Sequence, residues 1–244
     1  PHTYAHTAEG RQGMSFLLLA LTGAFAYFVG SLSTVQIASH LVFRKNLRKY
    51  PRNNFGITQF YRRYGKAGFL VLLVIELIRS LLPVLVGGWL MSILDCADIG
   101  RCFAFFCLLL GTAFPIMYRF KGEVSYFALM FGAMAVNFEI GAVLAIIMVI
   151  AYFATRYPAL AEVIAAVFMY GFSIITMEGA WVHTLLLLCM LLVLLQNAKT
   201  LYRIATHKQE KFKYVRDLSY MFDENEHFAK APEKPEGAGK GRKK

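Results

Sequence analysis

Long apolar runs separated by short polar segments fill most of the chain. A bilayer core of about 30 Å requires roughly 20 apolar residues per helix, so these runs predict about seven membrane helices. The expected helices cover residues 15–42, 67–91, 102–118, 124–136, 141–154, 158–176 and 181–196. The hydrophobic pattern therefore predicts an all-α integral membrane protein.

Two of the expected helices are shorter than the others. Residues 124–136 and 141–154 are separated by the polar segment Asn137-Phe138-Glu139. Two interpretations fit this pattern, a pair of short spans or a re-entrant hairpin, because neither run alone clearly matches the thickness of the hydrocarbon core.

Composition supports the membrane assignment and adds an orientation. Of the 244 residues, 57% are hydrophobic and 17% are charged, whereas soluble domains contain about 25% charged residues. The net charge is +11, and the cations concentrate in residues 44–66, which contain no carboxylate, and after residue 199. Cytoplasmic loops carry such an excess of cations, so we expect the N-terminus outside and the C-terminus in the cytoplasm. Nucleic-acid binding is disfavoured, because no recognised binding motif accompanies the charge.

Four regions follow from these shifts in composition. Residues 1–14 form an extracytosolic segment, within which Met14 is an alternative natural start, and residues 15–198 form the membrane domain. The first apolar run is too long for a signal-peptide core and is expected to stay uncleaved. Residues 199–231 are expected to include a basic amphipathic helix at the membrane surface, and residues 232–244 have the composition of a disordered tail.

The four cysteines do not have the spacing of a metal site. Cys96 and Cys102 flank one loop and would pair only if that loop faced an oxidising space, while Cys107 and Cys189 lie in apolar runs. Unpaired thiols are the favoured interpretation, and we expect neither a metal nor a cofactor.

The first polar loop carries the clearest chemical pattern. Asn54, Gly56 and Thr58 alternate along it, and glycine lets the backbone approach a ligand so that successive N–H groups can bind an anion. Arginines at positions 48, 52 and 62 supply paired donors for phosphate oxygens. The loop is therefore either an anion-binding site or a solvated, positively charged cytoplasmic loop.

Two charged residues interrupt the second apolar run. Glu76 and Arg79 lie one helical turn apart, in a region where unpaired charges are costly. Two interpretations remain open: the residues form an ion pair that holds helices together, or they contribute to an active site.

Several stretches, taken in order, resemble the bacterial acyl-phosphate-dependent glycerol-3-phosphate acyltransferases. The first-loop motif of that family matches this chain at Arg48, Asn54, Gly56, Thr58, Arg62, Gly65 and Lys66. Further family motifs resemble Gly30-Ser31, residues 76–80, residues 111–115, residues 120–122, and Arg156-Tyr157. The resemblance covers roughly residues 26–165, and Asn197 and Arg203 are similar to a closing motif.

The resemblance implies a reaction and a set of site residues. In that reaction the 1-hydroxyl of glycerol 3-phosphate attacks the carbonyl of a fatty acyl phosphate, giving lysophosphatidic acid and phosphate. It implies a multi-pass enzyme of the bacterial cell membrane, in contact with membrane lipids and without a cofactor or metal. The implied catalytic residues are Arg48, Asn54 and Thr58. The implied substrate-binding residues are Ser31, Gly56, Arg52, Arg62, Lys66, Lys121, Gly122 and Arg156.

Departures from the family pattern suggest two alternatives. Thr112 stands where the family has histidine, and Val124 stands where it has lysine. These differences favour, as a second hypothesis, a catalytically impaired paralogue that binds lipid or a partner protein. The charges at Glu76 and Arg79, with polar residues near Asn137, suggest a small transporter, although the sequence has no internal repeat of the kind that many transporters contain.

Overall fold

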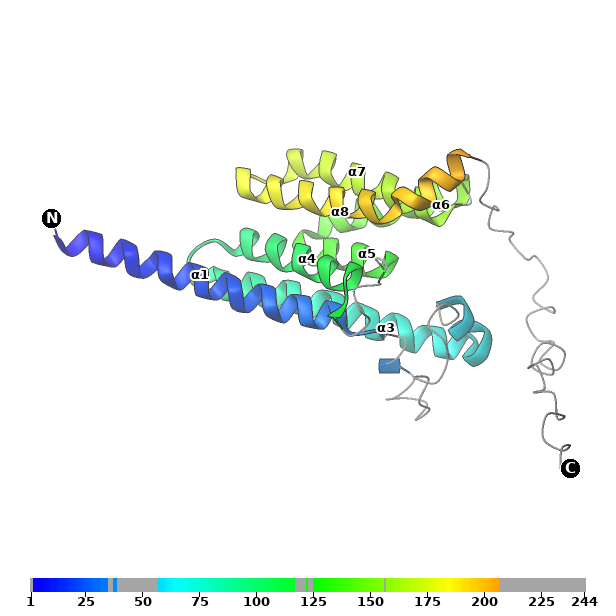
Figure 1. Cartoon of the computed structure of the whole chain (residues 1–244), viewed down its shortest axis with the longest axis horizontal. Helices are drawn as coiled ribbons and strands as arrows, with labels where there is room; N and C mark the ends of the chain where they lie inside the picture. The colour runs from blue at the N-terminus through cyan, green and yellow to red at the C-terminus, as the bar shows by residue number, and fades with distance from the viewer. Residues whose placement is uncertain are drawn as a thin grey trace, which may run out of the picture. The chain divides into compact units, whose positions relative to one another are not determined.

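The chain is all-helical wherever the computed structural model describes it. The described residues are 2–34, 37–38, 57–116, 122, 125–155 and 157–206, and side chains are described from residue 13 and, after the first loop, from Lys66. Seven helices lie within these ranges (Figure 1). They are α1 (His2–Ser31), α3 (Ile57–Ser92), α4 (Ala97–Ala113), α5 (Tyr126–Val136), α6 (Phe138–Thr155), α7 (Pro158–Thr176) and α8 (Ala180–Ala205).

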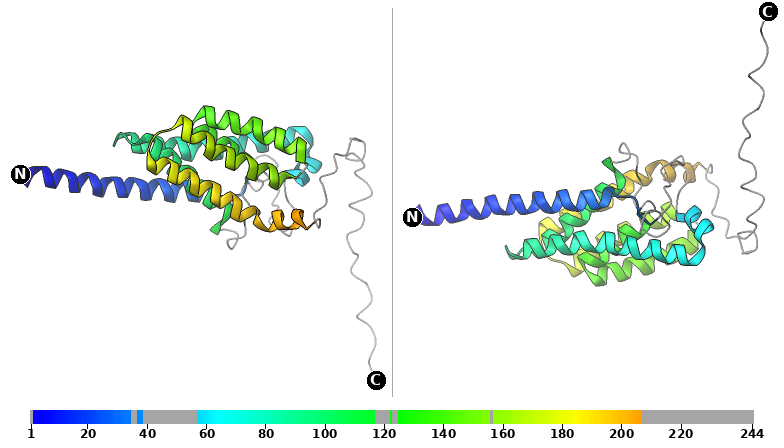
Figure 2. Two further views of the ribbon diagram at one scale, coloured as in Figure 1. Left: turned by 90° about the horizontal axis from the view of Figure 1, so that it is seen from above. Right: turned by 90° about the horizontal axis from the view of Figure 1, so that it is seen from below.

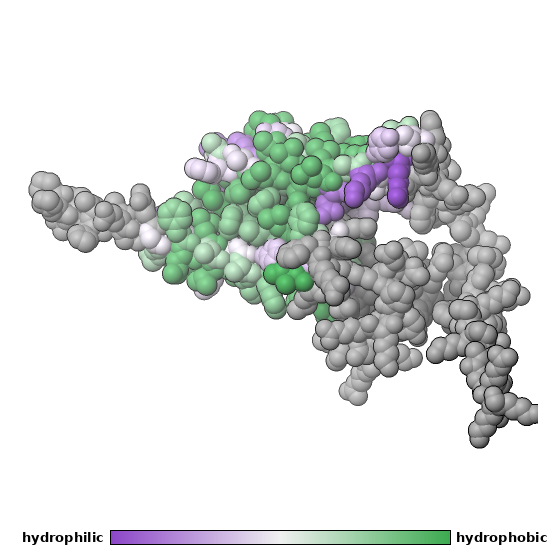
Figure 3. Space-filling view, in the orientation of Figure 1, coloured by the Kyte–Doolittle hydropathy of each residue, from purple (hydrophilic) through white to green (hydrophobic). Residues whose placement is uncertain are grey.

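Five of these helices contain stretches long and apolar enough to cross a membrane. The stretches are Gly13–Ser31, Lys66–Ser92, Phe138–Thr155, Pro158–Thr176 and Ala180–Ala205. Large hydrophobic side chains such as Phe16, Leu70 and Ile175 are exposed on their outer faces, and Figure 3 shows a broad hydrophobic surface over the packed helices. An apolar exterior of this extent suits contact with lipid rather than with water.

The helices form two groups that meet through α4 and α5. Helices α1, α3 and α4 pack against one another, and α7 packs between α6 and α8. Helix α5 contacts α3, α4 and α6, while α4 also contacts α8, and Figures 1 and 2 show α6, α7 and α8 running side by side. The core is centred on α4, where Phe105, Leu108 and Leu109 are fully buried.

The predicted helix ends were wrong at both sides of the first loop. Helix α1 ends at Ser31, not at residue 42, and α3 begins at Ile57, not at residue 67. Thr58 and Arg62, predicted as loop residues, therefore lie in the first turns of α3. At its other end, α1 begins at His2, so the polar N-terminal segment is helical and continuous with the first span.

The remaining boundaries show which sequence signals were reliable. Helix α4 begins at Ala97 and ends at Ala113, earlier than predicted at both ends, and its end agrees with the tendency of Pro115 to break a helix. Only Asn137 separates α5 from α6, and its Oδ1 accepts a hydrogen bond of 2.8 Å from the Glu139 N–H. Helix α6 has 18 residues and is long enough to cross a membrane, so of the two helices predicted to be short only α5 is short.

Two further predictions concern α8 and the cysteines. Helix α8 continues to Ala205, so the start of the predicted surface helix is part of the last span, and residues 207–244 lie outside the described residues. All four cysteines are free, which agrees with the interpretation as unpaired thiols and excludes a disulfide between Cys96 and Cys102 in this structure.

Candidate functional site

Helix α1 breaks inside the predicted first span, at three neighbouring hydroxyl residues. The Ser31 Oγ donates a hydrogen bond of 2.8 Å to the carbonyl of Tyr27, and the Leu32 N–H donates one of 3.3 Å to the Val29 carbonyl. A new turn then begins, with the Ile37 N–H bonded to the Ser33 carbonyl at 3.0 Å. Serine and threonine side chains compete with helical hydrogen bonds in this way, which explains why the helix stops among apolar neighbours.

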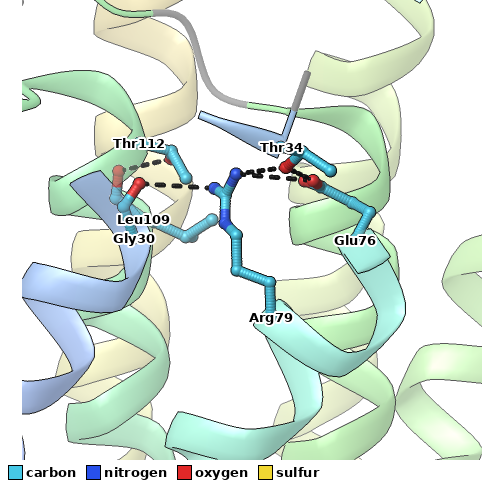
Figure 4. Close-up of polar contacts among 6 residues, drawn as sticks. All are labelled: Gly30, Thr34, Glu76, Arg79, Leu109 and Thr112. Atoms are coloured by element: carbon cyan, nitrogen blue, oxygen red, sulfur yellow. Dashed lines mark hydrogen bonds and ion pairs between the residues drawn. The ribbon is translucent and has the colours of Figure 1, made fainter. Parts of the chain in front are cut away.

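Arg79 of α3 lies against this break (Figure 4). Its Nη2 donates a hydrogen bond of 3.3 Å to the carbonyl of Gly30, and its Nη1 donates one of 2.6 Å to the Thr34 Oγ1. The Thr34 hydroxyl donates in turn to Glu76 Oε2, which lies 3.4 Å from Arg79 Nη1. All three side chains are buried. We call Gly30, Thr34, Glu76 and Arg79 the Arg79 network.

The backbones of α1 and α4 touch beside this network. A Cβ atom added at Gly30 would clash with the Leu108 carbonyl oxygen, and one added at Gly111 would clash with the Tyr27 carbonyl oxygen. Only glycine at these two positions lets the helices approach so closely. The family-like stretches at residues 30–31, 76–80 and 111–115 therefore meet in one place.

The end of α4 is fixed from three directions. The Phe114 carbonyl accepts a hydrogen bond of 2.6 Å from the Tyr27 hydroxyl of α1. The Ala113 carbonyl accepts two hydrogen bonds, one of 3.2 Å from the Gly122 N–H and one of 3.3 Å from Gln196 Nε2 of α8. Carbonyls that a helix end leaves without intrahelical donors are thus satisfied by residues distant in sequence.

Two helix C-termini consequently converge on the same place. The backbone contact between Gly30 and Gly111 brings the ends of α1 and α4 together, and each end carries a partial negative charge. Such an end by itself repels a phosphate. The guanidinium of Arg79 offsets this charge, and Glu76 neutralises part of the guanidinium in return.

Three of the predicted site residues have described side chains or backbone contacts. Ser31 is buried at the end of α1, Gly122 lies against the end of α4, and Lys66 is exposed on α3. Of Thr58 and Arg62 only the helical backbone in α3 is described. The other predicted residues, Arg48, Arg52, Asn54, Gly56, Lys121 and Arg156, lie outside the described residues. Ser31 and Gly122 are thus both beside the junction of α1 and α4.

Several polar residues that link neighbouring helices were not predicted from the sequence. Thr34 and Gln196 were not singled out, because a single hydroxyl or amide in an apolar run is a weak signal. Asn197 was noted only for its resemblance to a family motif, and its Nδ2 donates 3.0 Å to Glu162 Oε2 of α7. Glu162 is itself buried and was missed as well, although a charged residue inside a predicted span is a signal that could have identified it.

The opposite end of α3 has a different character. A hollow of about 410 Å³ lies between the turn after α3 and the turn before α8, and its lining includes Asp95, Asp98, Glu178 and Trp181. Carboxylates in this position disfavour an anionic ligand. Among the side chains that the structure describes, no group of three metal-ligating residues lies together.

Comparison with known proteins agrees with the membrane fold and the ordered motifs. The family model described as Glycerol-3-phosphate acyltransferase matches residues 20–207. A glycerol-3-phosphate acyltransferase of Macrococcus caseolyticus is 24% identical over 198 residues, covering 80% of this chain and 98% of the relative. One of Francisella tularensis is 25% identical over 198 residues, covering 81% of this chain and 94% of the relative.

Solved structures show the same fold. The glycerol 3-phosphate form of PlsY (YgiH), an integral membrane glycerol 3-phosphate acyltransferase, matches with a TM-score of 0.64 at 18% identity, over 84% of this chain and 98% of PlsY. Its lysophosphatidic acid form matches with a TM-score of 0.65 at 17% identity, over 80% and 95% of the two chains. The chain is therefore a multi-pass integral membrane protein that belongs to the glycerol-3-phosphate acyltransferase family.

Proposed function

We propose that this chain is an acyl-phosphate:glycerol-3-phosphate acyltransferase. The hydroxyl at C1 of glycerol 3-phosphate attacks the acyl carbonyl carbon, the bond from that carbon to the phosphate oxygen breaks, and the hydroxyl proton leaves with phosphate. The products are lysophosphatidic acid and inorganic phosphate. The observation that carries the proposal is the family match over residues 20–207.

The chemistry asks mainly for positioning of two anions. Phosphate is a good leaving group, so orientation and electrostatic stabilisation can supply the catalysis without a covalent intermediate. We assign Arg48, Asn54 and Thr58 to catalysis. Substrate binding is assigned to Ser31, Arg52, Gly56, Arg62, Lys66, Lys121, Gly122 and Arg156. These groups face the cytoplasm if the N-terminus is outside and the C-terminus inside, as the distribution of cations indicates.

An assay in proteoliposomes tests the proposal. The purified chain, given glycerol 3-phosphate and a fatty acyl phosphate, should form lysophosphatidic acid and release one phosphate per product. The double variant Arg48→Ala/Asn54→Ala should lose this activity, and Arg101→Gln, at the other end of the membrane domain, serves as the matched control. Product formation by the double variant at the wild-type rate would contradict the site, and no product from the wild type would contradict the function.

Thr112 favours a second candidate, a paralogue that binds phosphate ligands without turnover. The Thr112 side chain is buried, and its Oγ1 donates 2.8 Å to the Leu109 carbonyl, so the hydroxyl is engaged within α4. A Thr112→His/Val124→Lys variant that gains activity over an inactive wild type would support this candidate. Robust turnover by the wild type would exclude it.

A further inference from the structure

We propose that Arg79 is a positioning residue for the acyl transfer, because it holds both sides of the break in α1 from which the first polar loop departs. This inference rests on the acyltransferase function proposed above. Arg79 does not have to touch substrate in this role; it acts through the backbone at Gly30 and the side chain of Thr34.

The break needs a hydrogen-bond donor because of where it lies. An α-helix leaves its last carbonyls without intrahelical partners, and at this end the side chains of Ser31, Thr34 and Arg79 are buried, so water is not at hand to satisfy a carbonyl beside them. The Gly30 carbonyl lies 3.3 Å from Arg79 Nη2. The guanidinium thus caps a buried helix end.

The same guanidinium also binds the chain after the break. Its Nη1 donates 2.6 Å to the Thr34 hydroxyl, four residues beyond Gly30. A planar guanidinium holds several N–H donors in a fixed geometry, so it can bind Gly30 and Thr34 at the same time. A lysine ammonium acts as a point charge and does not reproduce these two hydrogen bonds. Arg79 therefore holds the chain on both sides of the break, at Gly30 and at Thr34.

The geometry argues against a role limited to joining helices as an ion pair. Glu76 and Arg79 both belong to α3, three residues apart, so their contact of 3.4 Å lies within one helix. Among the described residues, the pair also makes contacts that leave α3, to Gly30 and to Thr34. Glu76 neutralises Arg79 and accepts a hydrogen bond from Thr34. Both charges can therefore be removed together, which leaves no unpaired charge behind.

A cycle of neutral variants separates positioning from stability. The proteins are wild type, Arg79→Gln, Glu76→Gln and the double variant, with Asp98→Asn, Arg101→Gln and their double variant as the matched cycle on an exposed pair of the same spacing. Three quantities are measured in each: the melting temperature in detergent, kcat and KM for glycerol 3-phosphate, and hydrogen exchange in peptides containing Gly30–Thr34.

The proposal predicts that stability and activity separate. Arg79→Gln lowers the melting temperature, because Glu76 is left buried without its arginine, and the double variant recovers most of that loss. In both, kcat/KM stays at least tenfold below wild type and exchange at Gly30–Thr34 is faster, because the Gly30 carbonyl and Thr34 have lost their donor. Arg79→Lys recovers the melting temperature but not the exchange protection. The exposed cycle leaves kcat/KM and exchange unchanged and shifts the melting temperature only slightly.

Thr34→Val keeps both charges and removes the two hydrogen bonds of the Thr34 hydroxyl, to Glu76 and from Arg79, so it addresses the same question if Arg79→Gln does not fold. It should speed exchange and lower kcat/KM while the melting temperature stays near that of wild type. A double variant with wild-type kcat/KM and wild-type exchange would overturn the inference and leave Glu76 and Arg79 as a structural pair. A wild type without product would instead remove the proposed function, and the exchange measurements would then decide alone whether Arg79 holds the break.

Discussion

Two arginine–carboxylate pairs of identical spacing occupy very different parts of the molecule. Arg79 lies 3.4 Å from Glu76 on α3, and Arg101 lies 3.3 Å from Asp98 on α4. The first pair has side chains 8% and 2% exposed, whereas the second has side chains 40% and 59% exposed. Spacing and distance are thus nearly equal, and only the surroundings differ.

The surroundings decide what each pair does. Asp98 lines the acidic hollow beside the α3–α4 turn, where solvent weakens its attraction to Arg101. Arg79 instead caps the broken end of α1 and bonds Thr34. The comparison shows that an ion pair within one helix gains its importance from third partners on other elements.

The largest expected effect comes from removing each arginine in turn. Arg79→Gln leaves a buried carboxylate without its partner and should lower the free energy of unfolding by about 3–5 kcal/mol. Arg101→Gln removes an exposed pair and should cost only about 0–1 kcal/mol. Equilibrium unfolding in detergent measures both, and equal losses would show that burial does not distinguish the pairs.

A second prediction extends the comparison from charge to packing. Gly111→Ala forces α1 and α4 apart at the Tyr27 carbonyl and should cost about 1–3 kcal/mol of the free energy of unfolding. Gly171→Ala, in α7, meets no atom within 4 Å and should be neutral or stabilising by about 0.5–1 kcal/mol. Melting temperatures of the two variants test this, and a tolerated Gly111→Ala would mean that the helix contact is looser than described.

The smallest expected effect is the dependence on salt. The Debye length shortens from about 10 Å at 0.1 M to about 3 Å at 1 M, so the small cost of Arg101→Gln should disappear at high salt. The cost of Arg79→Gln should stay constant, because its buried partners are not screened. Unfolding of both variants at the two ionic strengths gives the result, and a salt-sensitive Arg79→Gln would place that pair in contact with water.

Apolar run length predicted the seven helices of the described residues better than it predicted where they end, although only five of them contain a stretch long and apolar enough to cross a membrane. Helix α7 begins and ends at the predicted residues, because Pro158 marks its start and Glu178 and Gly179 follow shortly after its end. The end of α1 was missed, since hydropathy does not register a hydroxyl that bonds its own backbone, as Ser31 does. The start of α3 was missed for the opposite reason: Ile57–Lys66 is polar and cationic, yet it is helical.

The candidate site was predictable as separate pieces but not as an arrangement. Charged residues in an apolar run identified Glu76 and Arg79, and ordered motifs identified Gly30, Ser31 and Gly111. No local pattern reveals that Arg79 reaches back to the Gly30 carbonyl, because the partners are 49 residues apart in sequence. Such contacts depend on how the helices pack, and packing is not encoded in any short stretch.

Labelling at the break in α1 tests the central claim, that this break opens onto a cytoplasmic site for phosphate substrates. A Ser33→Cys variant, with Cys96 replaced by serine, is treated with a membrane-impermeant maleimide in vesicles of each orientation. We predict labelling only from the cytoplasmic face, slowed by glycerol 3-phosphate and unaffected by glycerol. Labelling from the outer face, or labelling that glycerol 3-phosphate does not slow, would contradict it.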